Sequence, residues 1–313
     1  INVMEVAGEE IPLTKEDADA ILENGHELSC HYNFTLCDGK PKKSDKNNPL
    51  RATESETERQ AERFEDKFGL KPLAGATHCC IWYGGPEPAK WMKNVGGIAN
   101  NSNASPGHIF NGSNLGFAFG TAYPYYFYED AKNGNDRIGF MEIPITGYEL
   151  GHKASSLGDR REVDLSEIYM AVDVAATYHL IFNMFYHPVY IHEESGARKA
   201  IEGFLDTIAE KEITVVHMGT NAVAEWWNAR RKSSVSNVTY DRHAWSFDAS
   251  CAYKEGMIIK VPVDGKVVNL VIDDQERPFE TKEEFGYTWL YFICPWGDHK
   301  VQLIAEGSME WNK

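Results

Sequence analysis

The chain has 313 residues and a formal net charge of −16, and 25% of its residues are charged. This length is enough for a large core and for two domains. So acidic a surface repels phosphate backbones, which excludes nucleic acid as an expected partner. The sequence contains no apolar run of about 18 residues, the length needed to cross a bilayer, so no membrane span is expected.

Short apolar runs alternate with helical patterns in the first part of the chain. The Thr14-Lys-Glu-Asp segment resembles a capping box and predicts the start of a helix that stops at Gly25. The pattern predicts further helices at 54–68, 88–95, 165–185, 195–209 and 221–231. It predicts strands at 3–6, 28–31, 74–82, 117–127, 138–145 and 213–217. Such alternation is typical of parallel βα units.

The pattern changes after Lys232, where short strands separated by turns replace the helices. They are predicted at 238–240, 244–247, 256–263, 266–272, 289–293 and 300–304. This succession is typical of a small all-β sandwich. We therefore expect two domains, residues 1–232 and residues 233–313.

The six cysteines form no Cys-x-x-Cys pair, so a structural zinc site is not expected. Four lie in the first expected domain and two in the second, which permits disulfides without requiring them. The sequence also contains five Asn-x-Ser/Thr sequons, which give some support to an extracellular or cell-surface location. They begin at Asn33, Asn100, Asn103, Asn111 and Asn237.

The segment Gly25-His-Glu-Leu-Ser-Cys-His31 lies between a predicted helix and a predicted strand. It resembles the second motif of the polysaccharide deacetylase family, also known as the NodB-homology or carbohydrate esterase 4 family. Later segments resemble further family motifs in the same order. They are Gly97-Ile-Ala-Asn-Asn-Ser102, Phe119-Gly-Thr-Ala-Tyr-Pro124, Met141-Glu-Ile-Pro144, Phe185-Tyr-His-Pro188 and the helix at 220–230. The resemblance covers residues 1–232.

The resemblance implies an α/β fold, a distorted (β/α) barrel that here precedes the all-β sandwich. It implies a metal-dependent hydrolase that removes N- or O-acetyl groups from sugars, cleaving C–N amide bonds in acetylated amino sugars. In such a family a divalent metal, zinc or similar, is held by one Asp and two His residues and activates water. By position, His31 matches the first metal-binding His and His187 the late catalytic acid.

The sequence departs from the family pattern at three places. Thr35 stands where the second metal-binding His is expected, and Ala76 where an Arg is expected. The family's Asp-Asp strand should precede residues 3–6, where the chain has no such pair. Two explanations remain open: the first strand lies upstream of Ile1, or the barrel belongs to a non-catalytic relative. Because metal affinity depends on ligand number, we expect weak or no deacetylase activity and either a degenerate metal site or no metal at all.

Carbohydrate is the expected partner, and aromatic residues supply the candidate contacts. Tyr123, Tyr125 and Tyr126 surround a proline where the family places a substrate-facing loop, and aromatic rings stack on the apolar faces of sugars. His78 and Trp82, on the predicted strand at 74–82, are further candidates. Core packing of alternate tyrosines is an equally open interpretation.

Two further interpretations concern the cysteines and the function as a whole. Cys79 and Cys80 should point to opposite faces of the strand at 74–82, so at most one of them would lie beside His78. For the cysteines, burial or disulfide bonding is the favoured interpretation. The alternative function is a non-catalytic carbohydrate-binding or surface-structural protein that forms homo-oligomers or assembles with other chains.

Overall fold

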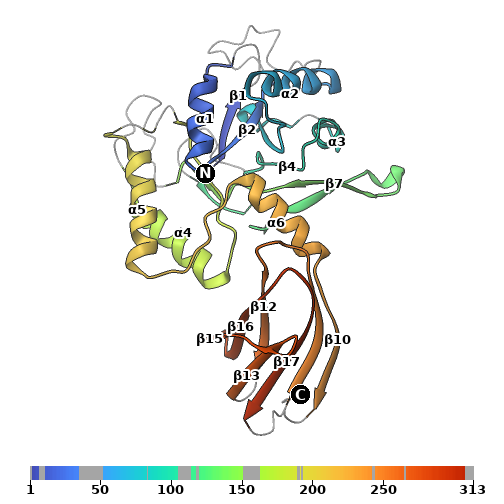
Figure 1. Cartoon of the computed structure of the whole chain (residues 1–313). Helices are drawn as coiled ribbons and strands as arrows, with labels where there is room; N and C mark the ends of the chain where they lie inside the picture. Colours follow the sequence, from blue (N-terminus) through green and yellow to red (C-terminus); the bar gives the residue numbers. More distant parts are fainter. Residues whose placement is uncertain are drawn as a thin grey trace. The chain divides into compact units, whose positions relative to one another are not determined.

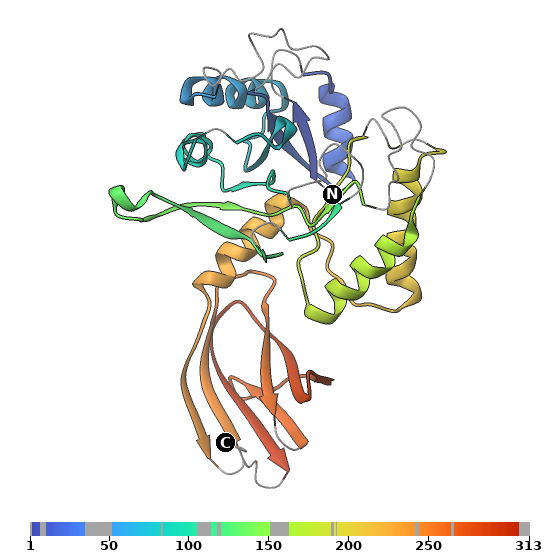
Figure 2. The same cartoon turned by 180° about the vertical axis from the view of Figure 1, so that it is seen from behind.

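The computed structural model describes residues 2–6, 11–34, 52–82, 84–104, 114–117, 120–150, 163–188, 191, 193–241, 244–263 and 266–306. The chain forms two compact units, residues 1–224 (unit 1) and residues 225–313 (unit 2), each described by itself (Figures 1 and 2). The division falls inside a helix, whereas the expected boundary at 232/233 follows the end of that helix.

The helices begin and end largely as the sequence predicts. They are α1 (Lys15–Glu23), α2 (Glu54–Phe68), α3 (Glu87–Asn94), α4 (Leu165–Tyr178), α5 (Gly196–Glu210) and α6 (Thr220–Lys232). Thr14 caps α1 by accepting a hydrogen bond from the backbone N–H of Asp17, and Ser195 caps α5 in the same way. None of the described helices has both the length and the apolarity needed to span a bilayer.

Unit 1 contains a six-stranded sheet in the order β1-β2-β3-β4-β7-β6. Its strands are β1 (Asn2–Val6), β2 (Glu27–Tyr32), β3 (Ala74–Thr77), β4 (Ala99–Asn100), β7 (Arg137–Glu142) and β6 (Tyr125–Tyr128). The first five run parallel, and β6 pairs antiparallel with β7. A second, three-stranded sheet contains β5 (Asn114–Leu115), β8 (Gly147–Tyr148) and β9 (Met184–Phe185), in which β8 and β9 are parallel.

The expected α/β class and the antiparallel C-terminal β region are confirmed. Within the described part of unit 1, however, the strands form these two separate sheets and no closed barrel. The parallel strands nevertheless bring their carboxyl ends to one edge of the sheet, which is where functional side chains gather in α/β folds.

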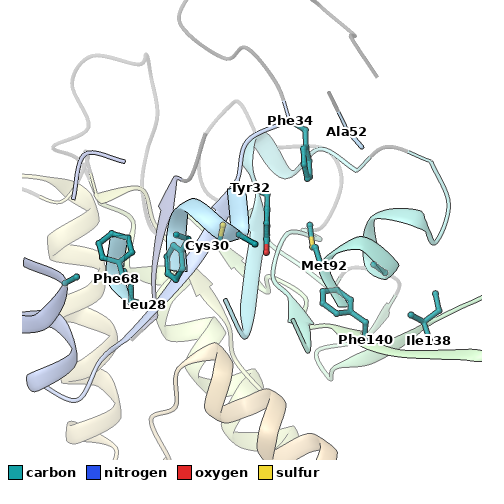
Figure 3. Close-up of a cluster of buried hydrophobic side chains, with 13 residues drawn as sticks. Leu28, Cys30, Tyr32, Phe34, Ala52, Phe68, Met92, Ile138 and Phe140 are labelled. Atoms are coloured by element: carbon teal, nitrogen blue, oxygen red, sulfur yellow. The ribbon is translucent and has the colours of Figure 1, made fainter. Parts of the chain in front are cut away.

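The hydrophobic core of unit 1 lies between the six-stranded sheet and helices α1, α2 and α3 (Figure 3). Leu28, Cys30 and Tyr32 of β2 point into it, together with Phe64 of α2 and Phe140 of β7. Successive side chains of a strand point to opposite faces, so His31 lies on the face of the sheet away from these helices. The packing of β2 thus fixes the side to which His31 is presented.

In the described part of unit 2, every element from Ser234 onward is a β-strand. One sheet has the order β10-β11-β17-β13-β14 and the other β12-β16-β15, and all pairs are antiparallel. The strands are β10 (Ser234–Asp241), β11 (Ala244–Cys251), β12 (Met257–Val263), β13 (Lys266–Ile272), β14 (Gln275–Glu276), β15 (Glu280–Glu284), β16 (Tyr287–Cys294) and β17 (Gly297–Glu306). Residues of both sheets share one hydrophobic core.

Four predicted elements of unit 1 were wrong in extent. The strand at 74–82 stops at Thr77 and continues as a 3-10 turn, His78–Cys80, because Cys80 takes a left-handed backbone with φ 53°. The helix at 165–185 stops at Tyr178, where His179 turns left-handed with φ 53°. The segment 117–127 yields a strand only from Tyr125 onward, and residues 213–217, which include the exposed Val216, pair with no described strand.

A close backbone approach fixes the turn from α3 into β4. The backbone N–H of Gly97 donates to the Met92 carbonyl, and a Cβ at position 97 would lie 2.7 Å from that oxygen. Gly97→Ala is expected to lower the free energy of unfolding by about 1–3 kcal/mol, because overpacking forces the backbone to shift. Urea unfolding of the full chain measures this.

The matched control is Gly25→Asn. Gly25 has φ +74°, no atom lies within 4 Å of the place that a Cβ would take there, and Asn tolerates a left-handed backbone. An equal loss of stability in the two variants would contradict the account of Gly97.

Candidate functional site

Two histidines from neighbouring strands meet at the carboxyl edge of the six-stranded sheet. His31 is the penultimate residue of β2 and lies in register with Ala76 of β3, and His78 directly follows β3. Their rings are 5.2 Å apart between centroids. The Nε2 atom of His31 is closed off from solvent, and no hydrogen-bond partner reaches it among the described residues.

His31 is electrostatically coupled to a third histidine. Burial is the largest of the causes that lower the pKa of His31 to about 3, and the charges of His78 and His187 add to it. His31 is therefore neutral at physiological pH, the form in which an imidazole nitrogen can accept a hydrogen bond or bind a metal. We call His31, His78 and His187 the histidine cluster.

His187 is held by a buried carboxylate. The Nδ1 atom of His187 lies 2.6 Å from Oε1 of Glu149, and the same oxygen accepts from the backbone N–H of His187 at 2.9 Å. The Glu149 side chain is 3% exposed and that of His187 is 41% exposed. With Nδ1–H donated to the carboxylate, Nε2 of neutral His187 becomes the proton acceptor.

The local backbone and two aromatic rings keep this pair in place. Glu149 directly follows β8 and has a left-handed backbone with φ 47°, a conformation that costs energy for a residue with a side chain. Its backbone N–H donates to the Phe185 carbonyl of β9. The rings of Phe185 and Tyr148 stand edge-on to the His187 imidazole, at 4.9 and 6.1 Å between centroids. Pairing of β8 with β9 thus brings the two residues together.

A second buried carboxylate, Glu142, ends β7 at the same edge of the sheet. Its oxygens accept hydrogen bonds from Asn100 Nδ2 at 2.5 Å, from the Ser102 N–H at 2.8 Å and from the Asn103 N–H at 2.6 Å. Burial raises the pKa of Glu142 to about 7, although the three donors act in the opposite direction. Glu142 therefore ties the segment after β4 to β7 and titrates near neutrality.

Two neighbours of Glu142 have raised pKa values. The Tyr125 hydroxyl accepts from Asn103 Nδ2 at 2.6 Å, and burial, with Glu142 adding to it, raises the pKa of Tyr125 to about 12. The same two causes raise the pKa of the Cys80 thiol to about 11. A thiol is a nucleophile only as a thiolate, so Cys80 is not an activated nucleophile.

The other predicted contact residues make different contacts. Trp82 stacks on Phe127 at 4.9 Å between centroids and packs against the core of unit 1. The guanidinium of Arg137 lies 5.0 Å from the centre of the Tyr126 ring. Tyr123 donates its hydroxyl hydrogen to backbone carbonyls at the end of α4. Of the five candidates, His78 belongs to the histidine cluster and Tyr125 is a neighbour of Glu142, whereas the contacts described above for the other three lie elsewhere.

The family's metal site is not reproduced by the described residues. Among them, no group of three or more His, Cys, Asp or Glu side chains is arranged to hold a metal ion. His31 and His78 offer two imidazoles, and Ala76 offers a small buried side chain where the family has Arg. Thr35, Cys37 and His192 lie outside the described residues, as does the Cys79 side chain. A divalent metal therefore stays a prediction.

Sequence reasoning missed both carboxylates. Glu142 carried a signal, since a lone acidic residue interrupts the apolar run Phe140-Met-Glu-Ile-Pro144. Glu149 carried none, because it meets His187 across 38 positions of the chain. Burial and strand pairing, which a single sequence does not reveal, distinguish these two from the other acidic residues.

Comparisons with known proteins give no sequence match. No protein-family model matches the chain, and no curated protein is significantly similar to it. Among solved structures, the chain is similar to a candidate polysaccharide deacetylase from Mycobacterium smegmatis, with 16% identity and a TM-score of 0.45 over 69% of this chain and 68% of that one.

Two glycoside hydrolases are also similar. One is a GH57 branching enzyme from Thermococcus kodakaraensis, with 10% identity and a TM-score of 0.39 over 65% of this chain and 48% of that one. The other is a family 39 glycoside hydrolase from Bacteroides cellulosilyticus, with 9% identity and a TM-score of 0.34 over 98% and 75%. TM-scores below 0.5 at such identities assign neither a fold nor an activity to this chain.

The lowered pKa of His31 predicts a loss of stability in acid. The folded state disfavours the charged imidazole. The contribution of neutral His31 to stability is therefore complete above the unfolded pKa of 6.5 and is lost as the pH falls toward 3. Wild type should lose about 2 kcal/mol relative to His31→Gln between pH 7 and pH 5. Urea unfolding across that range measures it; parallel curves for the two proteins would contradict the burial of His31.

The raised pKa of Glu142 predicts the opposite dependence. The folded state binds the proton more tightly than the unfolded state, so the contribution of Glu142 to stability is greatest below pH 4.5 and is lost as the pH rises through about 7. Relative to Glu142→Gln, wild type should lose about 3 kcal/mol between pH 4.5 and pH 8. The same urea unfolding series tests this through the change in unfolding free energy with pH. That change does not depend on any pH-independent loss of stability that the substitution itself causes.

Proposed function

We propose that unit 1 acts on acetylated amino-sugar glycans as a slow deacetylase of the polysaccharide deacetylase type, with His187 as its acid–base residue. The observation that carries the proposal is the hydrogen bond between Nδ1 of His187 and the buried Glu149 carboxylate. A buried carboxylate that fixes the tautomer and orientation of a half-exposed imidazole is the arrangement that general acid–base catalysis requires.

The chemistry assigned to His187 is proton transfer. In deacetylation, water adds to the acetyl carbonyl, the C–N bond breaks, and the sugar nitrogen leaves as an amine. His187 would accept the water proton at Nε2 and return it to the departing nitrogen, while Glu149 stabilises the imidazolium. The products, acetate and a free amine, then balance the amide and water consumed.

The other residues at the edge of the sheet would bind and position the glycan. His78 and Tyr125 are the proposed contacts, because His78 belongs to the histidine cluster and Tyr125 is a neighbour of Glu142. Neutral His31 lies beside His78, but its Nε2 is closed off from solvent, so no contact with the glycan is assigned to that atom. Slow turnover is proposed because the described residues do not complete the family's three-ligand set, so no step is assigned to a metal.

The sequence has Thr35 where the second metal-binding His is expected, which also favours a second candidate, a carbohydrate-binding protein without turnover. In that case the Glu149–His187 pair would only hold β8 against β9. The two candidates differ in one measurable quantity, acetate release.

The deciding experiment measures acetate released from N,N′,N″-triacetylchitotriose by the full chain, with added Zn²⁺ and with a chelator. We expect slow release that falls about 100-fold or more in His187→Gln, because general acid–base catalysis typically contributes that much. Glu149→Gln should also slow release, since it leaves the tautomer of His187 unspecified. His179→Gln is the matched control, because His179 is exposed at the end of α4 and should not matter.

Undiminished release in His187→Gln would contradict the role of that residue. Absence of acetate release from wild type, with and without Zn²⁺, would reject the deacetylase proposal and leave the binding protein.

A further inference from the structure

In unit 2, the sheet formed by β12, β16 and β15 (Figure 1) has one face packed in the core of that unit and an opposite, outer face. Leu290, Phe292 and Cys294 of β16 belong to the core shared with the other sheet. The alternate residues of β16 therefore lie on the outer face. They are Tyr287, Trp289, Tyr291 and Ile293. We call this row the β16 ridge.

The strand register places specific residues on either side of the ridge. On β12, Ile258, Lys260 and Pro262 lie opposite Ile293, Tyr291 and Trp289. On β15, Glu280, Lys282 and Glu284 lie opposite Tyr291, Trp289 and Tyr287. Three aromatic rings in a row are thus flanked by two lysines and two glutamates. The row from Tyr287 to Ile293 is about 20 Å long at the rise of an antiparallel strand.

Ion pairs and ring contacts fix the middle of the ridge. Lys260 Nζ lies 4.3 Å from the centre of the Trp289 ring and 5.1 Å from that of Tyr291, and it pairs with Glu284 at 2.6 Å. Glu284 also accepts a hydrogen bond from the Tyr291 hydroxyl. These contacts hold the rings before any ligand arrives, which reduces the entropy lost on binding.

The ends of the ridge are open to solvent. Tyr287 is 63% exposed, and its ring stands edge-on to that of Trp289 at 6.2 Å between centroids. At the other end Ile258 and Ile293, which lie opposite each other, are 68% and 65% exposed. The ridge thus has an exposed ring at one end and two exposed aliphatic side chains at the other, with the ion-paired residues between them. This elongated surface is both apolar and rich in hydrogen-bonding groups.

The chemistry of the ridge selects a glycan among the classes of ligand. The face is locally balanced in charge, two lysines against two glutamates, within a chain of net charge −16, so a polyanion is repelled at long range and a neutral chain is not. Pyranose rings present C–H groups to aromatic faces and hydroxyls to lysine and carboxylate groups. A straight row on a strand matches an extended chain, which β-linked pyranoses form, better than a coiled one.

We propose that the β16 ridge is a binding site for an extended, neutral, β-linked glycan chain, separate from the site in unit 1. Tyr287 supplies the exposed stacking ring, and Trp289 and Tyr291 continue the row. Lys260, Lys282 and Glu284 supply hydrogen bonds to hydroxyl groups. This site does not depend on the activity proposed for unit 1, because it holds a polymer without reacting with it.

The test uses the full chain and two insoluble polysaccharides, chitin and cellulose, with fully N-acetylated chitohexaose as a soluble, neutral probe for titration calorimetry. Wild type should bind at least one of the polymers, and Tyr287→Ala should weaken that affinity about tenfold, the scale of one aromatic stacking contact. Tyr240→Ala is the matched control, since Tyr240 is an exposed tyrosine on the other sheet of unit 2 and should leave binding unchanged.

Acetate release from N,N′,N″-triacetylchitotriose, measured in parallel, separates this proposal from the one for unit 1. Tyr287→Ala should leave that release unchanged, and polymer binding lost through Tyr287 in a protein that releases no acetate would still support the ridge. Failure of wild type to bind either polymer, or equal binding by wild type and Tyr287→Ala, would overturn it. A change of oligomeric state in Tyr287→Ala or Ile293→Ser without a change in glycan affinity would also overturn it, because the face would then be a protein interface.

Discussion

The hydrogen bond between Glu149 and Nδ1 of His187 is the interaction on which the candidate site in unit 1 depends. A carboxylate that is 3% exposed is costly to bury, and a charged or strongly polar partner offsets that cost. The partner here is supplied by the next strand, because β8 and β9 pair in parallel and end together. The same contact therefore satisfies the buried group and fixes the imidazole in one orientation.

Two other buried groups set the electrostatics around that pair. His31 is kept neutral by burial and by the other two imidazoles, whereas Glu142 is held close to its titration point by burial against three hydrogen-bond donors. At neutral pH His31 is thus uncharged and Glu142 is about half ionised, and both lie in buried surroundings. In such a surrounding, a proton moved by His187 has a larger electrostatic effect than it would have in water.

Much of the fold follows from local signals in the sequence. The caps at Thr14 and Ser195, the stop at Gly69 and the alternating pattern of β11 and β16 predict the element types, because each depends on neighbouring residues. The turn at His78–Cys80 and the end of α4 at His179 were missed, since residues with side chains there take left-handed backbones that no glycine announces.

The site was predictable only in part for a related reason. His31 and His187 were found through the resemblance to a family. Glu149, which bonds His187, and the hydrogen-bonded pair Glu142 and Asn100 are ordinary polar residues in the sequence. What sets them apart is burial at the ends of β4, β7 and β8, a property of the sheet as a whole. For the tyrosines around Pro124, the sequence predicted sugar contacts that the structure does not single out. The Tyr126 ring contacts Arg137, and the Tyr123 hydroxyl donates to a backbone carbonyl at the end of α4.

Nitrogen-15 spectra of the histidine side chains in the full chain, recorded near pH 8 and assigned by comparison with His187→Gln, test the central claim most directly. The account predicts that neutral His187 carries its proton on Nδ1, and that this preference is lost in Glu149→Gln. A proton found on Nε2 of His187 in the wild type would contradict it.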